Sequence, residues 1–170
     1  NSVGSVQWKK CYGGSSNDWP NAIQETSDGG YIVVGHTESN NGDVFGNHGD
    51  KDAWVLKLSN TGIVQWKKCY GGSAWEAARS ILQTEDGGYI FAGIAQSSDG
   101  DVSGVHGNLD FWVVKLSNIG VIEWQKALGG SNEDIARSIK QTSEGGYIVA
   151  GKTLSNDGDV SGNHGNVDYW

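Results

Sequence analysis

The pattern of apolar and polar positions along this chain repeats with a fixed period of 58 residues. Tryptophan marks the period at two places in each copy: Trp8, Trp66 and Trp124, then Trp54, Trp112 and Trp170. A period of this length indicates one supersecondary unit used three times. The copies cover residues 1–58, 59–116 and 117–170, and we expect them to fold as a single repeat domain over residues 1–170.

Each copy contains four short runs that alternate or cluster apolar residues as strands do. In the order of one blade these runs, labelled a to d, are Ala78–Thr84, Tyr89–Ala95 and Phe111–Leu116 of the middle copy and Val121–Leu128 at the start of the third. Runs a and b flank Glu85-Asp86-Gly87-Gly88, which predicts a hairpin because glycine supplies the positive φ of a tight turn. No helical period extends beyond a turn or two, so each copy is expected to form four antiparallel strands.

Four-stranded antiparallel units in series are typical of β-propeller blades. The chain begins on a d-type strand, Val6–Tyr12, and reaches a c-type strand at Tyr169 and Trp170. That offset suits a ring in which the first strand completes the last sheet. Propellers usually have 4–8 blades, so we predict an all-β fold of three blades that belong to a larger ring or to a ring shared by two chains.

The composition narrows the classes of partner. A formal net charge of −8 disfavours nucleic acid, because phosphate-backbone binding needs clustered Lys and Arg, and disfavours adsorption to anionic lipid. No apolar run approaches about 18 residues, so no membrane insertion is expected. An acidic surface fits solubility, cation binding or neutral ligands such as glycans. The first residue is Asn and no signal peptide follows, which suggests a processed mature chain or an excised piece of a longer one.

The two cysteines, Cys11 and Cys69, occupy equivalent positions in the first and second copies, and Ala127 replaces them in the third. Equivalent points on successive units are expected to lie too far apart for disulfide geometry. Both are therefore predicted to be unpaired thiols with no chemical role.

The c–d hairpin reads WVLKLSNTGIVQWKKCYGG and is similar to the blade signature of pyrroloquinoline-quinone-type propeller repeats. The whole 58-residue unit resembles a repeat common in secreted Bacteroidetes proteins, often ones that bear a type 9 secretion sorting domain. The resemblance runs through Trp66-Lys67-Lys68, Gly71-Gly72-Ser73, Asp86-Gly87-Gly88-Tyr89, Gly100-Asp101-Val102, His106-Gly107 and Asp110–Trp112. It implies a secreted or cell-surface propeller module. The sequence shows no cluster of quinone-binding residues, so we infer no dehydrogenase.

The loop between strands b and c is the first candidate site. It holds one His and a pair of Asp nine residues apart in every copy: Asp43 and Asp52, Asp101 and Asp110, Asp159 and Asp168. Oxygen-rich, glycine-punctuated loops can wrap Ca²⁺, although the spacing is not that of an EF-hand. The alternative is a loop whose Asp side chains accept hydrogen bonds from its own backbone N–H groups. One His per loop is too few for a zinc site.

A second acidic position recurs in the connection between strands d and a, at Asp18, Glu76 and Asp134. In a propeller the d–a and b–c connections emerge on the same face, so that face is expected to carry acidic loops around the axis. The alternatives for these three residues are N-capping and ion pairing with Arg79 and Arg137.

Trp19 and Trp75 each occur in only one copy. In the other copies the position of Trp19 holds Ala77 and Ile135, and the position of Trp75 holds Asn17 and Glu133. The blade core therefore does not require them. An exposed Trp can stack on a sugar or anchor a protein partner, and packing against the adjacent blade is the alternative.

No Ser lies in a GxSxG context, and neither Cys recurs in all copies near a His, so a nucleophilic enzyme is poorly supported. We predict a non-catalytic extracellular binding module that presents acidic loops to a glycan or a surface protein. The alternatives are a structural spacer of a large adhesin-like surface protein, and the propeller part of a larger secreted enzyme.

Overall fold

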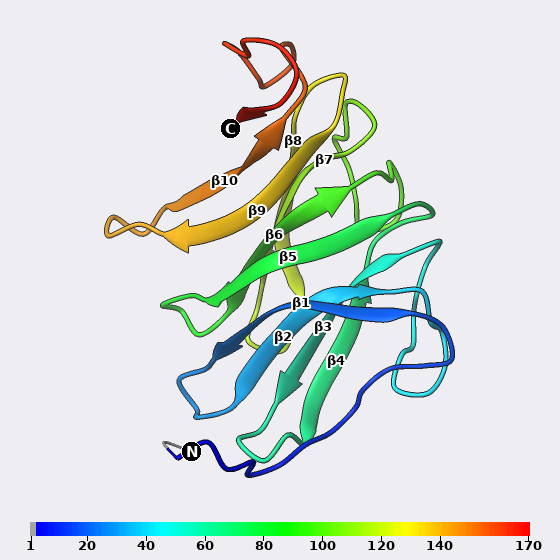
Figure 1. Cartoon of the computed structure of the whole chain (residues 1–170), viewed down its shortest axis with the longest axis vertical. Helices are drawn as coiled ribbons and strands as arrows, with labels where there is room; N and C mark the ends of the chain where they lie inside the picture. Colours follow the sequence, from blue (N-terminus) through cyan, green and yellow to red (C-terminus); the bar gives the residue numbers. More distant parts are fainter. Residues whose placement is uncertain (1–2) are drawn as a thin grey trace.

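The computed structural model describes residues 3–170, and these fold into three antiparallel sheets stacked along the long axis of the molecule (Figure 1). The first sheet contains β1 (Asp18–Glu25), β2 (Tyr31–Thr37), β3 (Asp52–Leu58) and β4 (Val64–Tyr70). The second contains β5 (Glu76–Gln83), β6 (Tyr89–Ala95), β7 (Asp110–Leu116) and β8 (Ile122–Leu128). The third contains β9 (Asp134–Gln141), β10 (Tyr147–Thr153) and β11 (Asp168–Tyr169).

Within each sheet every strand pairs with the next strand in sequence, so the chain forms three consecutive meanders. We call each sheet a blade. The a-type strands β1, β5 and β9 contact one another in series and lie side by side in Figure 1. The predicted all-β fold with antiparallel four-strand repeats is confirmed. Over residues 3–170 no helix is long and apolar enough to cross a membrane.

The hairpin between the a and b strands forms at the predicted Gly-Gly turns. Gly29, Gly87 and Gly145 adopt positive φ angles of 75°, 82° and 81°. In the second blade the turn is closed by two backbone hydrogen bonds, from Thr84 N to Gly88 O at 3.0 Å and from Gly87 N to Thr84 O at 2.9 Å. Glycine is needed there because side chains rarely adopt that backbone conformation.

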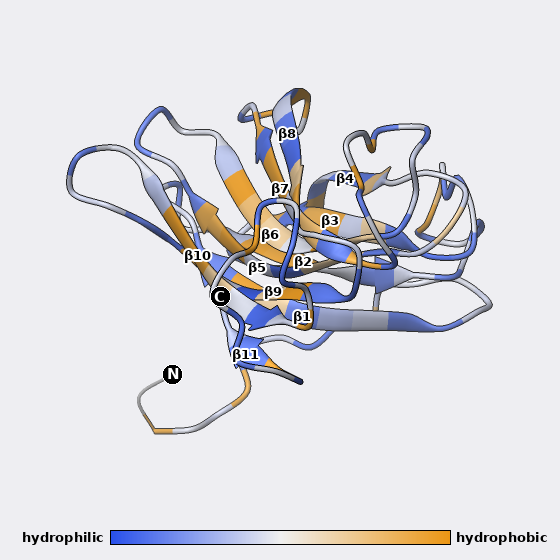
Figure 2. Cartoon of the chain, turned by 90° about the horizontal axis from the view of Figure 1, so that it is seen from above, coloured by the Kyte–Doolittle hydropathy of each residue, from blue (hydrophilic) through white to orange (hydrophobic). Residues whose placement is uncertain are grey.

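The core lies between the blades, and the middle blade is buried on both faces. Every residue of β6 and β7 is buried, whereas β10 is largely half-buried or exposed. Figure 2 shows that hydrophobic residues concentrate on the strands, while the loops are mostly hydrophilic. Phe91 and Trp112 meet edge to face at 5.4 Å at the centre of this core. Because a central blade is covered on both faces, its inner strands do not alternate between buried and exposed side chains.

The predicted d-type strand Val6–Tyr12 does not form as a strand, because no c-type strand lies beside it to accept its hydrogen bonds. Its side chains nevertheless take the positions that β4 takes in the next blade. Lys10 Nζ and Tyr12 Oη both donate to Gly62 O, as Lys68 Nζ and Tyr70 Oη donate to Gly120 O.

Both cysteines are free, as predicted. The sequence also predicts that both are partly buried, which is wrong for Cys11, because that side chain is exposed, whereas Cys69 is buried beside β3. Burial, together with the nearby charges of Asp52 and Asp18, raises the pKa of Cys69 to about 12. Cys69 is therefore a packing residue, and Cys11 is the accessible thiol of the pair.

Candidate binding surface

The d–a and b–c connections of each blade meet at one end of the molecule. Asp43 N donates to Gly13 O at 2.9 Å, and Gly13 N donates back to Asp43 Oδ2 at 3.3 Å. The same reciprocal pair joins Gly71 to Asp101, and Gly129 to Asp159. The structure thus brings together the two groups of acidic loops, which we call the loop end of the molecule.

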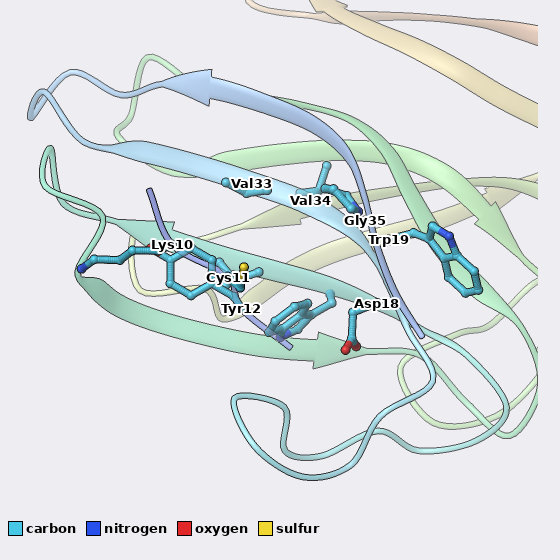
Figure 3. Close-up of a pocket in the computed structure, with 11 residues that line it drawn as sticks. Lys10, Cys11, Tyr12, Asp18, Trp19, Val33, Val34 and Gly35 are labelled. Carbon is cyan, nitrogen blue, oxygen red and sulfur yellow. The ribbon is translucent and has the colours of Figure 1, made fainter. Parts of the chain in front are cut away.

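The acidic residues of the d–a connection act as internal anchors of the loop end. Asp18 Oδ2 accepts from Gly14 N at 2.8 Å, Glu76 Oε2 from Gly72 N at 2.8 Å, and Asp134 Oδ2 from Gly130 N at 2.8 Å. Glu76 and Asp134 are fully buried. Hydrogen bonding to backbone N–H groups and hydroxyls therefore occupies these carboxylates, although Asp18 is half-buried and also lines the cavity of Figure 3, and ligand binding by the three residues stays a prediction.

The second Asp of each b–c loop closes its own loop. Asp52 Oδ2 accepts from His48 N at 3.1 Å and lies 2.6 Å from His48 Nδ1. Asp110 and Asp168 hold His106 and His164 in the same way. The loop conformation is thus fixed by a carboxylate that caps the backbone four residues earlier.

The two Asp of each predicted calcium pair face different connections. Asp43 bonds to Gly13 of the connection that precedes its blade, whereas Asp52 faces Gly71 of the connection that follows it. Among residues 3–170, no group of three or more His, Cys, Asp or Glu side chains is placed to hold a metal ion. Calcium binding by Asp43, Asp52, Asp101, Asp110, Asp159 and Asp168 stays a prediction.

Carboxylates of successive blades approach each other in the buried interior of the loop end. A Cβ atom on Gly71 would lie 2.8 Å from Asp52 Oδ1 and 2.7 Å from Glu76 Oε2. Gly129 lies in the same way between Asp110 Oδ1 and Asp134 Oδ2, each 2.7 Å from such an atom. Only glycine permits this approach, because any side chain would collide with both carboxylates.

Asp52 Oδ1 and Asp110 Oδ1 are buried and have no hydrogen-bond partner among the described residues. Burial raises the pKa of both carboxyls above the usual range, and the charges of Glu76 and Asp134 add to the effect. Keeping Asp52 and Asp110 ionised therefore lowers the stability of the folded chain.

The side chains that break the repeat gather where the first and second blades meet. Lys51 Nζ lies 6.0 Å from the ring centroid of Trp19 and 5.3 Å from that of Trp75. The opposite face of the cluster is formed by His36, whose ring stacks on Trp19 with centroids 4.8 Å apart. We call these four residues the aromatic–cation cluster.

Backbone pairing between blades creates the aromatic–cation cluster. Lys51 and Trp75 form an isolated parallel bridge, in which Lys51 N donates to Ala74 O at 3.2 Å and Glu76 N donates to Lys51 O at 2.7 Å. An ion pair with Glu38 at 3.1 Å orients the Lys51 side chain. Strands far apart in sequence thereby set the spacing of the two indoles.

The cluster combines exposed and buried parts. Trp19 is 44% exposed, and in Figure 3 its ring extends away from Lys10, Cys11 and Tyr12, which line the same cavity as Trp19. Trp75 packs partly against Ala77 and Ile94 of the second blade. Burial lowers the pKa of His36, and the charges of Arg79 and Lys51 lower it further, so this imidazole is held neutral.

No protein-family model matches this chain, and no curated protein is detectably similar in sequence. The evidence for a binding surface therefore comes from the chain's own three copies. The positions of Trp19, His36 and Lys51 correspond in the second copy to Ala77, Ile94 and Leu109, which together with Ile135 form a buried apolar cluster. Packing between blades thus does not require the aromatic–cation cluster.

Sequence reasoning identified Trp19 and Trp75 but missed Lys51 and His36. A lone Lys or His in a polar segment is usually a solvated residue. Comparison of the copies would have found both, because His36 and Lys51 each take the place of an apolar residue of the middle copy.

Proposed function

We propose that this chain is a non-catalytic binding module that recognises a glycan at the aromatic–cation cluster. The observation that carries the proposal is that Lys51 Nζ lies 6.0 Å from the Trp19 ring and 5.3 Å from the Trp75 ring, while Trp19 is 44% exposed. An indole face stacks on the apolar face of a sugar ring, and an ammonium group donates to its hydroxyl or carboxylate oxygens. The resemblance to repeats of secreted and cell-surface propeller proteins is consistent with such a partner.

The test is a glycan array probed with the chain, run once in calcium and once in EDTA. Binding that persists in EDTA is expected, since the acidic side chains of the loop end are engaged in internal hydrogen bonds. Binding that disappears in EDTA would instead direct attention to the six Asp residues of the b–c loops. Absence of binding under both conditions would overturn the glycan proposal.

The residues of the site are tested by substitution. Trp19→Ala and Trp75→Ala should each weaken binding of a hit glycan at least about tenfold, or about 1.4 kcal/mol. Trp124→Ala is the matched control, because Trp124 is 39% exposed but lies on β8, outside the aromatic–cation cluster. An equal loss from all three variants, measured by calorimetry, would contradict this site.

A further inference from the structure

The internal contacts between blades define a two-sided interface. At the first boundary Ile32, Val34, Ala53, Val55 and Tyr70 of the first blade cluster with Ala78, Ile81, Phe91 and Trp112 of the second. The next boundary repeats it, with Ile90, Ala92, Phe111, Val113 and Leu128 of the second blade against Ala136, Ile139, Val149 and Trp170 of the third. Each blade therefore has a trailing face, which packs forward, and a leading face, which receives the blade before it.

Two of these faces are left uncovered. The leading face of the first blade carries the residues equivalent to the receiving set, which are Pro20, Ile23, Val33 and Trp54. The trailing face of the third blade carries Ile148, Ala150 and Tyr169. The two blades lie at opposite ends of the molecule (Figure 1).

Solvent exposure shows that both faces lack the partner that the repeat provides elsewhere. Ile23 is 62% exposed, although its equivalents Ile81 and Ile139 are buried. Ile148 is also 62% exposed, although its equivalents Ile32 and Ile90 are buried. The leading face is in addition hollowed by an apolar cavity of about 310 Å³ lined by Tyr12, Val33 and Trp54 (Figure 3).

The pairing of strands at the two ends of the molecule leads to the same conclusion. The third sheet contains only β11, β10 and β9 and lacks a d-type strand beside β11. The segment at residues 6–12 has the d-type sequence and is anchored to the first blade through Gly62 O, but it has no strand to pair with. One copy thus carries an unpaired edge, and a second copy carries the segment that fits it.

The register of that pairing follows from the repeat. In the first blade Ala53 pairs with Tyr70 and Trp54 with Cys69, so the equivalent pairs are Tyr169 with Tyr12 and Trp170 with Cys11. Trp170 already exchanges both backbone hydrogen bonds with Gly151. Its pairing with Cys11 would therefore be of the non-hydrogen-bonded kind, in which the Cα atoms lie about 4.5 Å apart.

We propose that two copies of the chain of residues 1–170 associate head to tail, with the trailing face of each third blade on the leading face of the other first blade, and close into a six-bladed ring. Both contacts are of the same heterologous kind, and they close a ring when the three blades of each copy turn through half a circle, whereas any other rotation gives an open series of copies. Six blades lie within the usual range of 4–8. Residues 6–12 of each copy complete the third sheet of the other.

A disulfide trap tests the register. In Trp170→Cys the new thiol faces Cys11 of the other copy at a distance that a disulfide spans, about 4.4–6.8 Å between Cα atoms. Under mild oxidation we expect a covalent dimer with no larger species, and the additional substitution Cys11→Ser should abolish it. A variant that stays monomeric, or that forms a ladder of larger species, would overturn the ring.

A second variant leaves the Trp170 stack on Phe111 intact. Ile148→Arg places a charge on the exposed trailing face and should convert a dimer, at twice the 18.1 kDa chain mass by light scattering, into a folded monomer. Ile119→Arg is the matched control, because Ile119 is 63% exposed in the β7–β8 turn, outside both faces. A parent chain that is monomeric at every concentration, or dimers that withstand Ile148→Arg, would also overturn the proposal.

Discussion

Two residues of the middle copy differ together from their equivalents in the other copies, and the longer side chain of one compensates for the hydroxyl group that the other lacks. In the first and third copies a short carboxylate, Asp18 or Asp134, accepts from a Thr hydroxyl on the b-type strand, and that hydroxyl in turn accepts from a Ser N–H. The middle copy replaces this Thr by Ala95. Glu76 has one more methylene than Asp, and its Oε1 reaches Ser97 N directly at 2.8 Å.

The exchange predicts strong coupling between these two positions. Glu76→Asp should lower the free energy of unfolding by about 1–3 kcal/mol, because the buried Ser97 N–H loses its acceptor, whereas Gln96 N keeps Trp75 O. Ala95→Thr alone should also destabilise the chain, because a larger side chain enters a packed site. The double variant restores the arrangement of the other copies and should recover most of the loss in urea denaturation. If the stability losses of the two single variants simply add in the double variant, the proposed coupling between the two positions is contradicted.

At the scale of one element, a buried lysine fastens the a–b hairpin of each of the first two blades to its c-type strand. Lys115 Nζ on β7 lies 2.9 Å from Asp86 in the turn and 3.0 Å from Glu123 on β8. Asp86 also accepts from Thr84 Oγ1 and from Gly88 N. Lys57 and Asp28 make the same contact in the first blade.

The turn should lose stability in acid. The hydrogen bonds from Thr84 and Lys115 hold the pKa of Asp86 well below its usual range. A lowered pKa contributes stability that is complete above the unfolded value of about 3.9 and is lost only as pH falls through the lower folded value. Asp86→Asn should therefore cost under about 1 kcal/mol near pH 7, since the side chain is 60% exposed, and this cost should begin to shrink below about pH 4 and vanish only well below about pH 3.

Glu144→Gln, at the equivalent turn of the third blade, is the control for this prediction. There Gly146 N donates to Thr142 Oγ1, so the turn is closed by a different acceptor. Thermal unfolding followed from pH 7 into strong acid, well below about pH 3, should separate the two variants at neutral pH and bring them together only at the acid end. A constant difference across that range would exclude the proposed role of the Asp86 charge.

The strands and hairpins could be predicted from the sequence because turn glycines and period-two alternation are local signals. The complete burial of β6 could not, because it depends on a blade on each side, and the equivalent strands β2 and β10 are only partly buried. Trp19 became a candidate because it interrupts the repeat. Lys51 was missed because its place between two indoles arises from pairing with Trp75, which no local pattern records.

At the scale of the whole molecule, burial is highest in the middle blade and falls toward both ends. Ile32 and Ile90 occupy equivalent positions and are fully buried, whereas Ile148 is not. Equivalent residues of identical type therefore lie in different environments. The difference is set only by whether another blade covers them.

The same substitution at these positions should have unequal effects. Ile90→Ala should lower the free energy of unfolding by about 2–5 kcal/mol, because it removes buried methyl groups and leaves a cavity. Ile148→Ala should cost under about 0.5 kcal/mol in dilute solution, where its side chain stays in water. If urea titrations of dilute protein give similar losses of unfolding free energy for the two variants, the third blade is covered even in a single copy.

The hydrogen bonds between blades have a consequence for how the chain folds. They join residues at nearly constant separations of 50, 52 and 59 positions, as in Tyr70 to Gly120, Lys68 to Gly120 and Ile139 to Ser80. The loop that must close for each added blade thus has the same length wherever the blade lies, and its entropic cost does not grow with the number of blades. Folding can then propagate from one blade to the next, so the rate of each docking step depends on one unit rather than on total chain length.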